Sequence, residues 1–363
     1  MEKYLNEAII GNKNILATFS ANGEMLRVSY PNRDNRQYLK YFHTGVKVND
    51  SNIIYLHEDV NNVYMQYYDI DTNILNTEIT NNYFNLKIVQ TDFVTIKENI
   101  IVKRYSFINE SNNDQNVKFL IHSELLSDTN NLVSGMEIDN GMIQYAHDFS
   151  FAIFSKSEKV ESCQINGSQN NIYTGIIGGK DYIGMSKDSS ISFDLGVIPA
   201  GTKKCIDINI IIDESNNTMN DFIDEIERIR KIDLNKEYAD TKAYWRKYLK
   251  EHDGLKIKEP ENSYDSIIQK IYKRSILLFP LLINEKTGGI VASPEVDEEF
   301  SQCGRYAYCW PRDAVFITRA LDILKMNSEA SKFYNVFCKM TQSKNGMWEQ
   351  RFYTDGKLAP SWG

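Results

Sequence analysis

The apolar residues of this chain change their spacing near Ser215, and this change constrains the fold more than any other feature. Before that point, short runs rich in β-branched and aromatic residues alternate with turn residues, which predicts strands. After it, apolar residues recur every three or four positions, which predicts helices. At 363 residues, the chain is long enough for two domains, a β part followed by an α part.

Residues 1–212 are predicted to form an antiparallel β sandwich, because many short strands follow one another without helical periodicity. Asn22-Gly23 and Asn140-Gly141 each separate two candidate strands. Both residue types tolerate positive φ, so each pair predicts a two-residue hairpin turn. Ile206–Ile210 alternates apolar and polar residues and is the predicted last strand.

Residues 213–255 are predicted to form a helical linker that packs on the sandwich. Its first helix is indicated by an apolar stripe at helical spacing: Met219, Phe222, Ile223, Ile226 and Ile229.

Residues 256–363 are predicted to be α-helical. Ser263 is a candidate N-cap for the first helix, Pro311 suits the first turn of the next, and a third helix is expected from about Ser328 to Thr341. A long loop, Asn284–Trp310, joins the first two, and loops of this length in compact domains are usually functional.

Composition and local patterns exclude several classes of protein. The net charge of −8 argues against nucleic acid and anionic membranes as partners. The start of the chain has no basic segment followed by an apolar core, so we expect a cytoplasmic protein. The longest apolar run, Ile276–Ile283, is shorter than the roughly 20 residues that a membrane span needs.

No metal site or cofactor is expected from the sequence. The five cysteines lack CxxC spacing and predict free thiols. The five histidines are scattered and lack HxH or HExxH spacing.

The strongest candidate site is the run Arg305–Ala314. Tyr306, Tyr308 and Trp310 directly precede Arg312 and Asp313, which lie at the start of a predicted helix. An Arg-Asp pair alone is ordinary at a helix start. With aromatic neighbours it resembles a sugar site, since Arg offers a planar fork of donors, Asp accepts from hydroxyls, and aromatic rings stack on C–H faces.

A second aromatic cluster, Gly346–Gly356, follows the last predicted helix and contains Trp348. All the tryptophans lie in the C-terminal third of the chain, which favours a ligand site there: Trp245, Trp310, Trp348 and Trp362.

A run of carboxylates precedes the candidate site: Glu295, Asp297, Glu298 and Glu299. Paired carboxylates can act as acid and base. Acidic runs in polar loops are more often solvated, so we expect a surface segment here.

Together these segments resemble glycoside hydrolase family 15, in its prokaryotic glucoamylase and glucodextranase branch. The matching segments are Ile10–Ala17, Tyr30-Pro31, Tyr244–Leu249, Gly289–Pro294, Tyr306–Ala314 and Trp348–Gly363. The resemblance implies an N-terminal antiparallel β super-sandwich (1–212), a helical linker (213–255) and the beginning of an incomplete (α/α)6 toroid (256–363). It also implies an inverting, exo-acting hydrolase that releases glucose from α-glucans.

The resemblance assigns substrate-binding roles to six residues. Arg312 and Asp313 would hold the terminal glucose, and Trp362 would lie beside the general acid. The full set is Tyr306, Trp310, Arg312, Asp313, Trp348 and Trp362. The expected ligand is an α-linked gluco-oligosaccharide.

The family's general acid and base both follow the Ser-Trp-Gly segment, so they are expected downstream of Gly363. The 363-residue chain is therefore expected to be a truncated, inactive copy. Its helices would then expose an apolar stripe that includes Ile276, Leu277, Phe316 and Ile323, and such patches favour aggregation.

Three alternatives stay open at this point: a non-catalytic carbohydrate-binding or assembly module, a trehalose-cleaving enzyme and an inverting disaccharide phosphorylase. The Trp-Pro-Arg-Asp motif resembles the hydrolases more than the phosphorylases.

Overall fold

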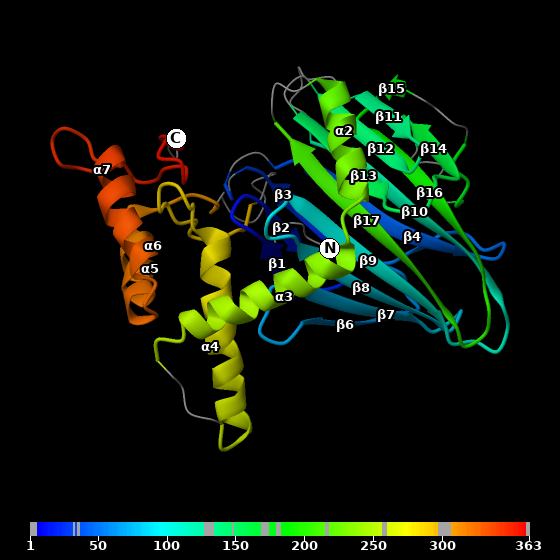
Figure 1. Cartoon of the computed structure of the whole chain (residues 1–363), viewed down its shortest axis with the longest axis horizontal. Helices are drawn as coiled ribbons and strands as arrows, with labels where there is room; N and C mark the ends of the chain where they lie inside the picture. Colours follow the sequence, from blue (N-terminus) through cyan, green and yellow to red (C-terminus); the bar gives the residue numbers. More distant parts are fainter. Residues whose placement is uncertain are drawn as a thin grey trace.

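The computed structural model describes residues 6–31, 33–34, 37–126, 134–146, 149–167, 174–178, 183–214, 218–255, 260–296 and 306–360. Strands occupy the chain up to Asp213, and the described elements after Thr218 are helical. Figure 1 shows the strands on one side of the molecule and the helices from Ser263 onward on the other. The predicted order of a β part followed by helices is confirmed.

The strands pair antiparallel throughout. They are β1 (Ala8–Gly11), β2 (Leu16–Phe19), β3 (Met25–Ser29), β4 (Leu39–Val48), β5 (Ile54–Tyr55), β6 (Asn62–Tyr68), β7 (Leu75–Asn81), β8 (Leu86–Val94), β9 (Ile100–Asn109), β10 (Gln115–Leu125), β11 (Ser134–Ile138), β12 (Gly141–Ala146), β13 (Phe149–Ser155), β14 (Ser162–Ile165), β15 (Ile183–Met185), β16 (Asp188–Ile198) and β17 (Lys203–Asp213).

The strands form three sheets, ordered β1-β2-β3, β14-β16-β10-β4-β5 and β15-β11-β12-β13-β17-β9-β8-β7-β6. One apolar core joins all three. The two larger sheets face each other across it, as aromatic contacts show: Phe119 of β10 lies 4.7 Å from Tyr105 and 5.4 Å from Phe107 of β9 between ring centroids. The predicted antiparallel sandwich is therefore present.

Both Asn-Gly hairpins exist, but neither has the predicted two-residue Asn-Gly turn. Between β2 and β3 the turn is longer: Gly23 N donates to Ser20 O, and only Gly23 of the pair has positive φ, at 83°. Between β11 and β12, Ile138 pairs with Gly141, so Gly141 already belongs to the strand. An Asn-Gly pair therefore predicts where a hairpin lies better than it predicts the type of turn. The type of turn also depends on the register of the two strands.

Two helices follow the last strand: α2 (Met219–Arg230) and α3 (Leu234–Glu251). Phe222, Ile226 and Ile229 of α2 pack on the outer face of the nine-stranded sheet, as the helical stripe predicts. The N-terminal end of α3 packs on the same face. Its C-terminal half places Trp245 and Leu249 in the core of the helical part, so α3 bridges the two parts (Figure 1).

The remaining helices are α4 (Ser263–Leu282), α5 (Pro311–Ile323), α6 (Asn327–Lys332), a π-helical turn η1 (Phe333–Phe337) and α7 (Cys338–Thr341). Pro311 opens α5 as predicted. Asn262, rather than Ser263, caps α4 by accepting from Asp265 N. Asn is as good an N-cap as Ser, so sequence alone did not fix this boundary.

Two adjacent buried residues, Arg33 and Asp34, join the β part to the helical part. The Arg33 guanidinium donates to Leu281 O at 3.1 Å and to Pro280 O at 3.0 Å, carbonyls in the last turn of α4. Such carbonyls have no partner inside the helix. Asp34 accepts from the hydroxyl of Thr354 at 2.9 Å and also from its N–H.

The prediction that one apolar stripe is exposed is wrong for two of its four residues. Ile276 and Leu277 are buried, with 0% and 2% exposure, because α4 packs against α3 and the β1–β2 hairpin. Phe316 and Ile323 on α5 are exposed, at 73% and 52%. Among the described residues, no helix is long and apolar enough to cross a membrane.

Candidate sugar-binding site

The extended segment that leads into α5 places alternate residues in two different clusters. Ala307 and Cys309 belong to the core of the helical part. Tyr308 and Trp310 face the other way and pack with Ala359. Alternation of this kind follows from the two-residue period of extended chain. The segment thus presents aromatic rings on one face while its other face is anchored in the core.

The predicted motif segments meet at this point. Cys309 exchanges both backbone hydrogen bonds with Phe352, at 2.8 and 2.9 Å, and Ala292 N donates to Tyr308 O at 2.9 Å. Phe352 also bridges to Leu358. Segments around residues 292, 309 and 352, which the sequence singled out separately, therefore lie side by side.

Trp310 is the centre of this arrangement. Its ring has two guanidinium groups near it: Arg351 at 5.4 Å and Arg312 at 5.7 Å from a ring centroid. Arg351 also lies 5.3 Å from the ring of Tyr308 and donates to Pro360 O at 2.6 Å. Cations within about 6 Å of an aromatic centroid are attracted to its face. Trp310 is buried, and its Nε1 has no hydrogen-bond partner among the described residues.

Arg312 and Asp313 lie in the first turn of α5, where the helix dipole favours the carboxylate. They form an ion pair with each other at 3.1 Å, and their side chains are 74% and 44% exposed. Tyr306 is 43% exposed. Three predicted ligand residues are thus exposed to solvent at the N-terminal end of α5, next to the buried Trp310.

Trp348 is not brought to Trp310 by any described contact. It is 41% exposed, and its Nε1 donates to Cys338 O at 3.2 Å at the start of α7. Trp362, the last predicted ligand residue, lies outside the described residues. The substrate-binding roles of all six residues stay predictions.

The expectation of a solvated acidic segment fails at Glu295. This residue is only partly exposed, and its Oε2 is buried without a described hydrogen-bond partner. Its backbone carbonyl accepts from Tyr306 N at 3.1 Å, which holds the segment against the candidate site. Asp297, Glu298 and Glu299 lie outside the described residues.

Arg351 and Tyr353 lie in the second aromatic cluster that the sequence indicated, Gly346–Gly356, but neither was among the predicted site residues. The ring of Tyr353 lies 5.2 Å from that of Tyr308. The period-two spacing of Tyr306, Tyr308 and Trp310 could have indicated an extended segment with one aromatic face. The sequence indicated the segment that contains Arg351 but not its contact with Trp310, because the pairing of Cys309 with Phe352 joins distant parts of the chain.

Comparisons with known proteins find glycoside hydrolases. Residues 266–357 match the model of Glycosyl hydrolases family 15. An uncharacterized glycosyl hydrolase of Methanocaldococcus jannaschii is 25% identical over 360 residues, which cover 96% of this chain and 55% of that protein. The chain thus spans about half the length of this relative.

Two solved structures share the fold. A bacterial glucoamylase complexed with acarbose superposes with a TM-score of 0.77 at 14% identity, covering 99% of this chain and 53% of that one. A human-microbiome protein assigned as a kojibiose phosphorylase gives a TM-score of 0.54 at 14% identity, covering 96% and 51%.

The predicted resemblance is confirmed: residues 266–357 match the model of glycoside hydrolase family 15, and the chain shares the fold of a bacterial glucoamylase over nearly all of its length.

Proposed function

We propose that this chain supplies the glucose-holding part of an inverting, exo-acting α-glucoside hydrolase. The observation that carries the proposal is the convergence of three motif segments on Trp310, inside the region that matches the family. Arg312 and Asp313 would hydrogen-bond the hydroxyls of the terminal glucose, while Tyr306 and Trp310 would form an aromatic wall.

The exposed Arg312–Asp313 pair suits this role. Each side chain now compensates the charge of the other at 3.1 Å. Sugar hydroxyls can both donate and accept, so one glucose residue could bind the guanidinium and the carboxylate together. Trp348 and Trp362 are proposed to contact the same oligosaccharide.

Inverting hydrolysis needs one carboxylic acid that protonates the glycosidic oxygen and one carboxylate that activates water. By resemblance, both are proposed to follow Gly363. Glu349 and Asp355 are not assigned to either role; Asp355 forms an ion pair with Lys357 at 3.0 Å.

Calorimetry with acarbose tests the binding role. Hydrogen bonds to charged groups contribute about 1.5–3 kcal/mol each, so Arg312→Gln and Asp313→Asn should each raise the Kd by about tenfold or more. Arg319→Gln and Asp322→Asn are matched controls, because both residues are exposed on the same helix. Equal affinity of site and control variants for acarbose would refute the assignment.

A second candidate is an inverting disaccharide phosphorylase, favoured by the fold shared with the kojibiose phosphorylase. The two reactions differ in the nucleophile, water or phosphate. A longer protein that carries this region would give glucose 1-phosphate only in the phosphorylase case, when it is incubated with disaccharide and inorganic phosphate.

A further inference from the structure

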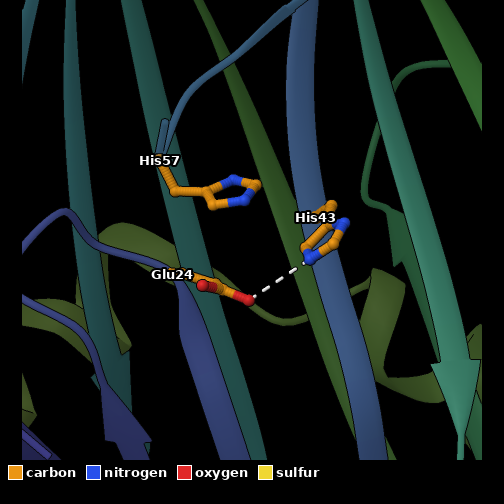
Figure 2. A group of neighbouring side chains, drawn as sticks. All are labelled: Glu24, His43 and His57. Atoms are coloured by element: carbon orange, nitrogen blue, oxygen red, sulfur yellow. Dashed lines mark ion pairs between the residues drawn. The ribbon is translucent and has the colours of Figure 1, made fainter. Parts of the chain in front are cut away.

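A cluster of Glu24, His43 and His57 lies in the β part and is absent from the site above. Their nitrogen and oxygen ligand atoms all lie within 4.8 Å of one another. Figure 2 shows the side chains of Glu24 and His57 both directed toward His43. The carboxylate Oε1 of Glu24 is 3.3 Å from Nε2 of His43. The rings of the two histidines stack with centroids 4.6 Å apart.

The three side chains come from different parts of the sandwich. His43 lies in β4, and His57 follows β5 in the same five-stranded sheet. Glu24 directly precedes β3 of the three-stranded sheet. The cluster therefore spans the junction of two sheets.

Hydrogen bonds to backbone carbonyls hold these segments in place. Asn22 Nδ2 donates to His57 O at 2.9 Å, which fastens the β2–β3 turn to the segment that carries His57. Leu56 N donates to Thr44 O at 2.9 Å, which fastens that same segment to β4. Gln90 Nε2 donates to Gly23 O at 2.8 Å and fixes the turn from the opposite sheet. A site built on fixed backbone needs little rearrangement to bind an ion.

The polar atoms of the cluster are suited to a ligand. His57 is buried, and its Nδ1 has no hydrogen-bond partner among the described residues. A buried polar atom without a partner is costly. The side chains of His43 and Glu24 are 20% and 9% exposed, so an ion could reach them from solvent.

Geometry and charge both favour a cation. At metal–ligand distances of about 2.0–2.1 Å, tetrahedral ligand atoms lie about 3.3 Å apart, the separation already present between Glu24 and His43. A turn of the His57 ring would complete the set. Glu58 adds a second negative charge near His57. The rings of Tyr41 and Tyr55 lie beside the cluster, 5.0 and 5.9 Å from that of His43.

We propose that Glu24, His43 and His57 bind one divalent first-row transition metal ion, with Zn²⁺ the best match, and that this ion cross-links the two sheets. Two imidazoles and one carboxylate are ligands that Zn²⁺ takes, whereas Mg²⁺ and Ca²⁺ prefer oxygen. Three protein ligands leave a position for water. The proposal is independent of sugar binding.

The test is calorimetry with ZnCl₂ on the chelator-treated 363-residue chain, together with its thermal unfolding. We expect one Zn²⁺ per chain and a higher unfolding midpoint with Zn²⁺. His43→Gln, His57→Gln and Glu24→Gln should each weaken binding by at least about tenfold and remove the rise in midpoint. His252→Gln, at the end of α3, is the matched control and should bind as the wild type does.

Circular dichroism identifies the variants that keep the fold. If one of the three ligand variants does not fold, the other two still test the proposal. Co²⁺ provides a second readout, because a site with two histidines and one carboxylate gives ligand-field bands without thiolate charge transfer. Zn²⁺ binding by folded His43→Gln and His57→Gln at wild-type affinity would overturn the proposal. So would a thiolate-to-Co²⁺ band, which would place the ion on a cysteine.

Discussion

Trp310 shows how much the role of one residue depends on a partner far along the chain. The Trp-Pro-Arg-Asp motif contains Arg312, but Arg351 lies equally close to the ring, at 5.4 against 5.7 Å. Arg351 also fixes the chain at Pro360 through its Nε. A single guanidinium thus positions two aromatic rings and the following segment.

The substitution Arg351→Lys should reveal this positioning role. Lysine keeps the charge but lacks the planar fork that stacks on a ring and donates along its edge. We expect a loss of about 1 kcal/mol in unfolding free energy and a several-fold rise in the Kd for acarbose. Both are measurable by urea unfolding and calorimetry.

Lys357→Gln is the control for this change, because Lys357 is a nearby exposed cation paired with Asp355. Unchanged acarbose binding in Arg351→Lys would show that Arg351 does not position the site.

Single residues also mark the limit of sequence reasoning. The Arg312–Asp313 run was evident because its members are adjacent in the chain. Glu24, His43 and His57 have no motif spacing and meet only because β3, β4 and β5 come together. Arg351 reaches Trp310 through the pairing of Cys309 with Phe352, which no local pattern encodes.

At the scale of elements, α3 matters most to the structure, because it contacts both the β part and the helical part. Its first turn packs on the nine-stranded sheet and its last turns on α4. Helical periodicity predicted α2, because its apolar stripe is clear. Turn type and cap identity were less predictable, since alternatives such as Asn262 and Ser263 are nearly equal in energy.

The N-cap of α3 offers a direct test. Asp233 accepts from Asn235 N at 3.0 Å and from Lys236 N at 3.3 Å. Asp233→Ala should lower the unfolding free energy by about 1 kcal/mol, because these N–H groups lose their acceptor. Asp233→Ser restores a capping oxygen and should recover most of the loss in urea unfolding. Equal losses in both variants would mean that the cap is not the cause.

At the scale of the whole molecule, the Arg33–Asp34 pair makes the joint between the two parts sensitive to pH. Burial raises the pKa of Asp34 from 3.8 to about 6, although hydrogen bonds from Thr354 oppose the shift. Burial also lowers the pKa of Arg33 to about 10, so it stays charged at neutral pH. The joint therefore carries one permanent charge and one that titrates in weak acid.

The sign of this effect follows from proton linkage. Between the unfolded pKa near 3.8 and the folded pKa near 6, the folded state holds more protons at Asp34. Stability from this group is thus fully present below pH 4 and is lost as pH rises through 6. The loss amounts to about 3 kcal/mol for a buried group.

Asp34→Asn should remove this dependence. Relative to the variant, the wild type should lose about 3 kcal/mol of unfolding free energy between pH 4 and pH 7, measured by urea unfolding at each pH. Asp50→Asn, in an exposed turn, is the control and should follow the wild type. A constant difference between wild type and Asp34→Asn across this range would contradict the prediction.

The order of the two parts and the family resemblance were predictable because both depend on local spacing and on one contiguous motif. The burial of Ile276 and Leu277 was not, because it depends on how α4 docks against α3 and the β1–β2 hairpin. Which apolar stripe becomes buried depends on how the helices pack together. The sequence of a stripe does not show which element covers it.

The alternation of residues 307–310 between two clusters also restricts how relatives of this chain can diverge. Inserting or deleting one residue within the segment would turn Cys309 toward the aromatic face and Trp310 toward the core. Substitutions can accumulate there, but changes in length must fall elsewhere. Among homologues, the spacing from Tyr306 to Pro311 should be constant even where the residues differ.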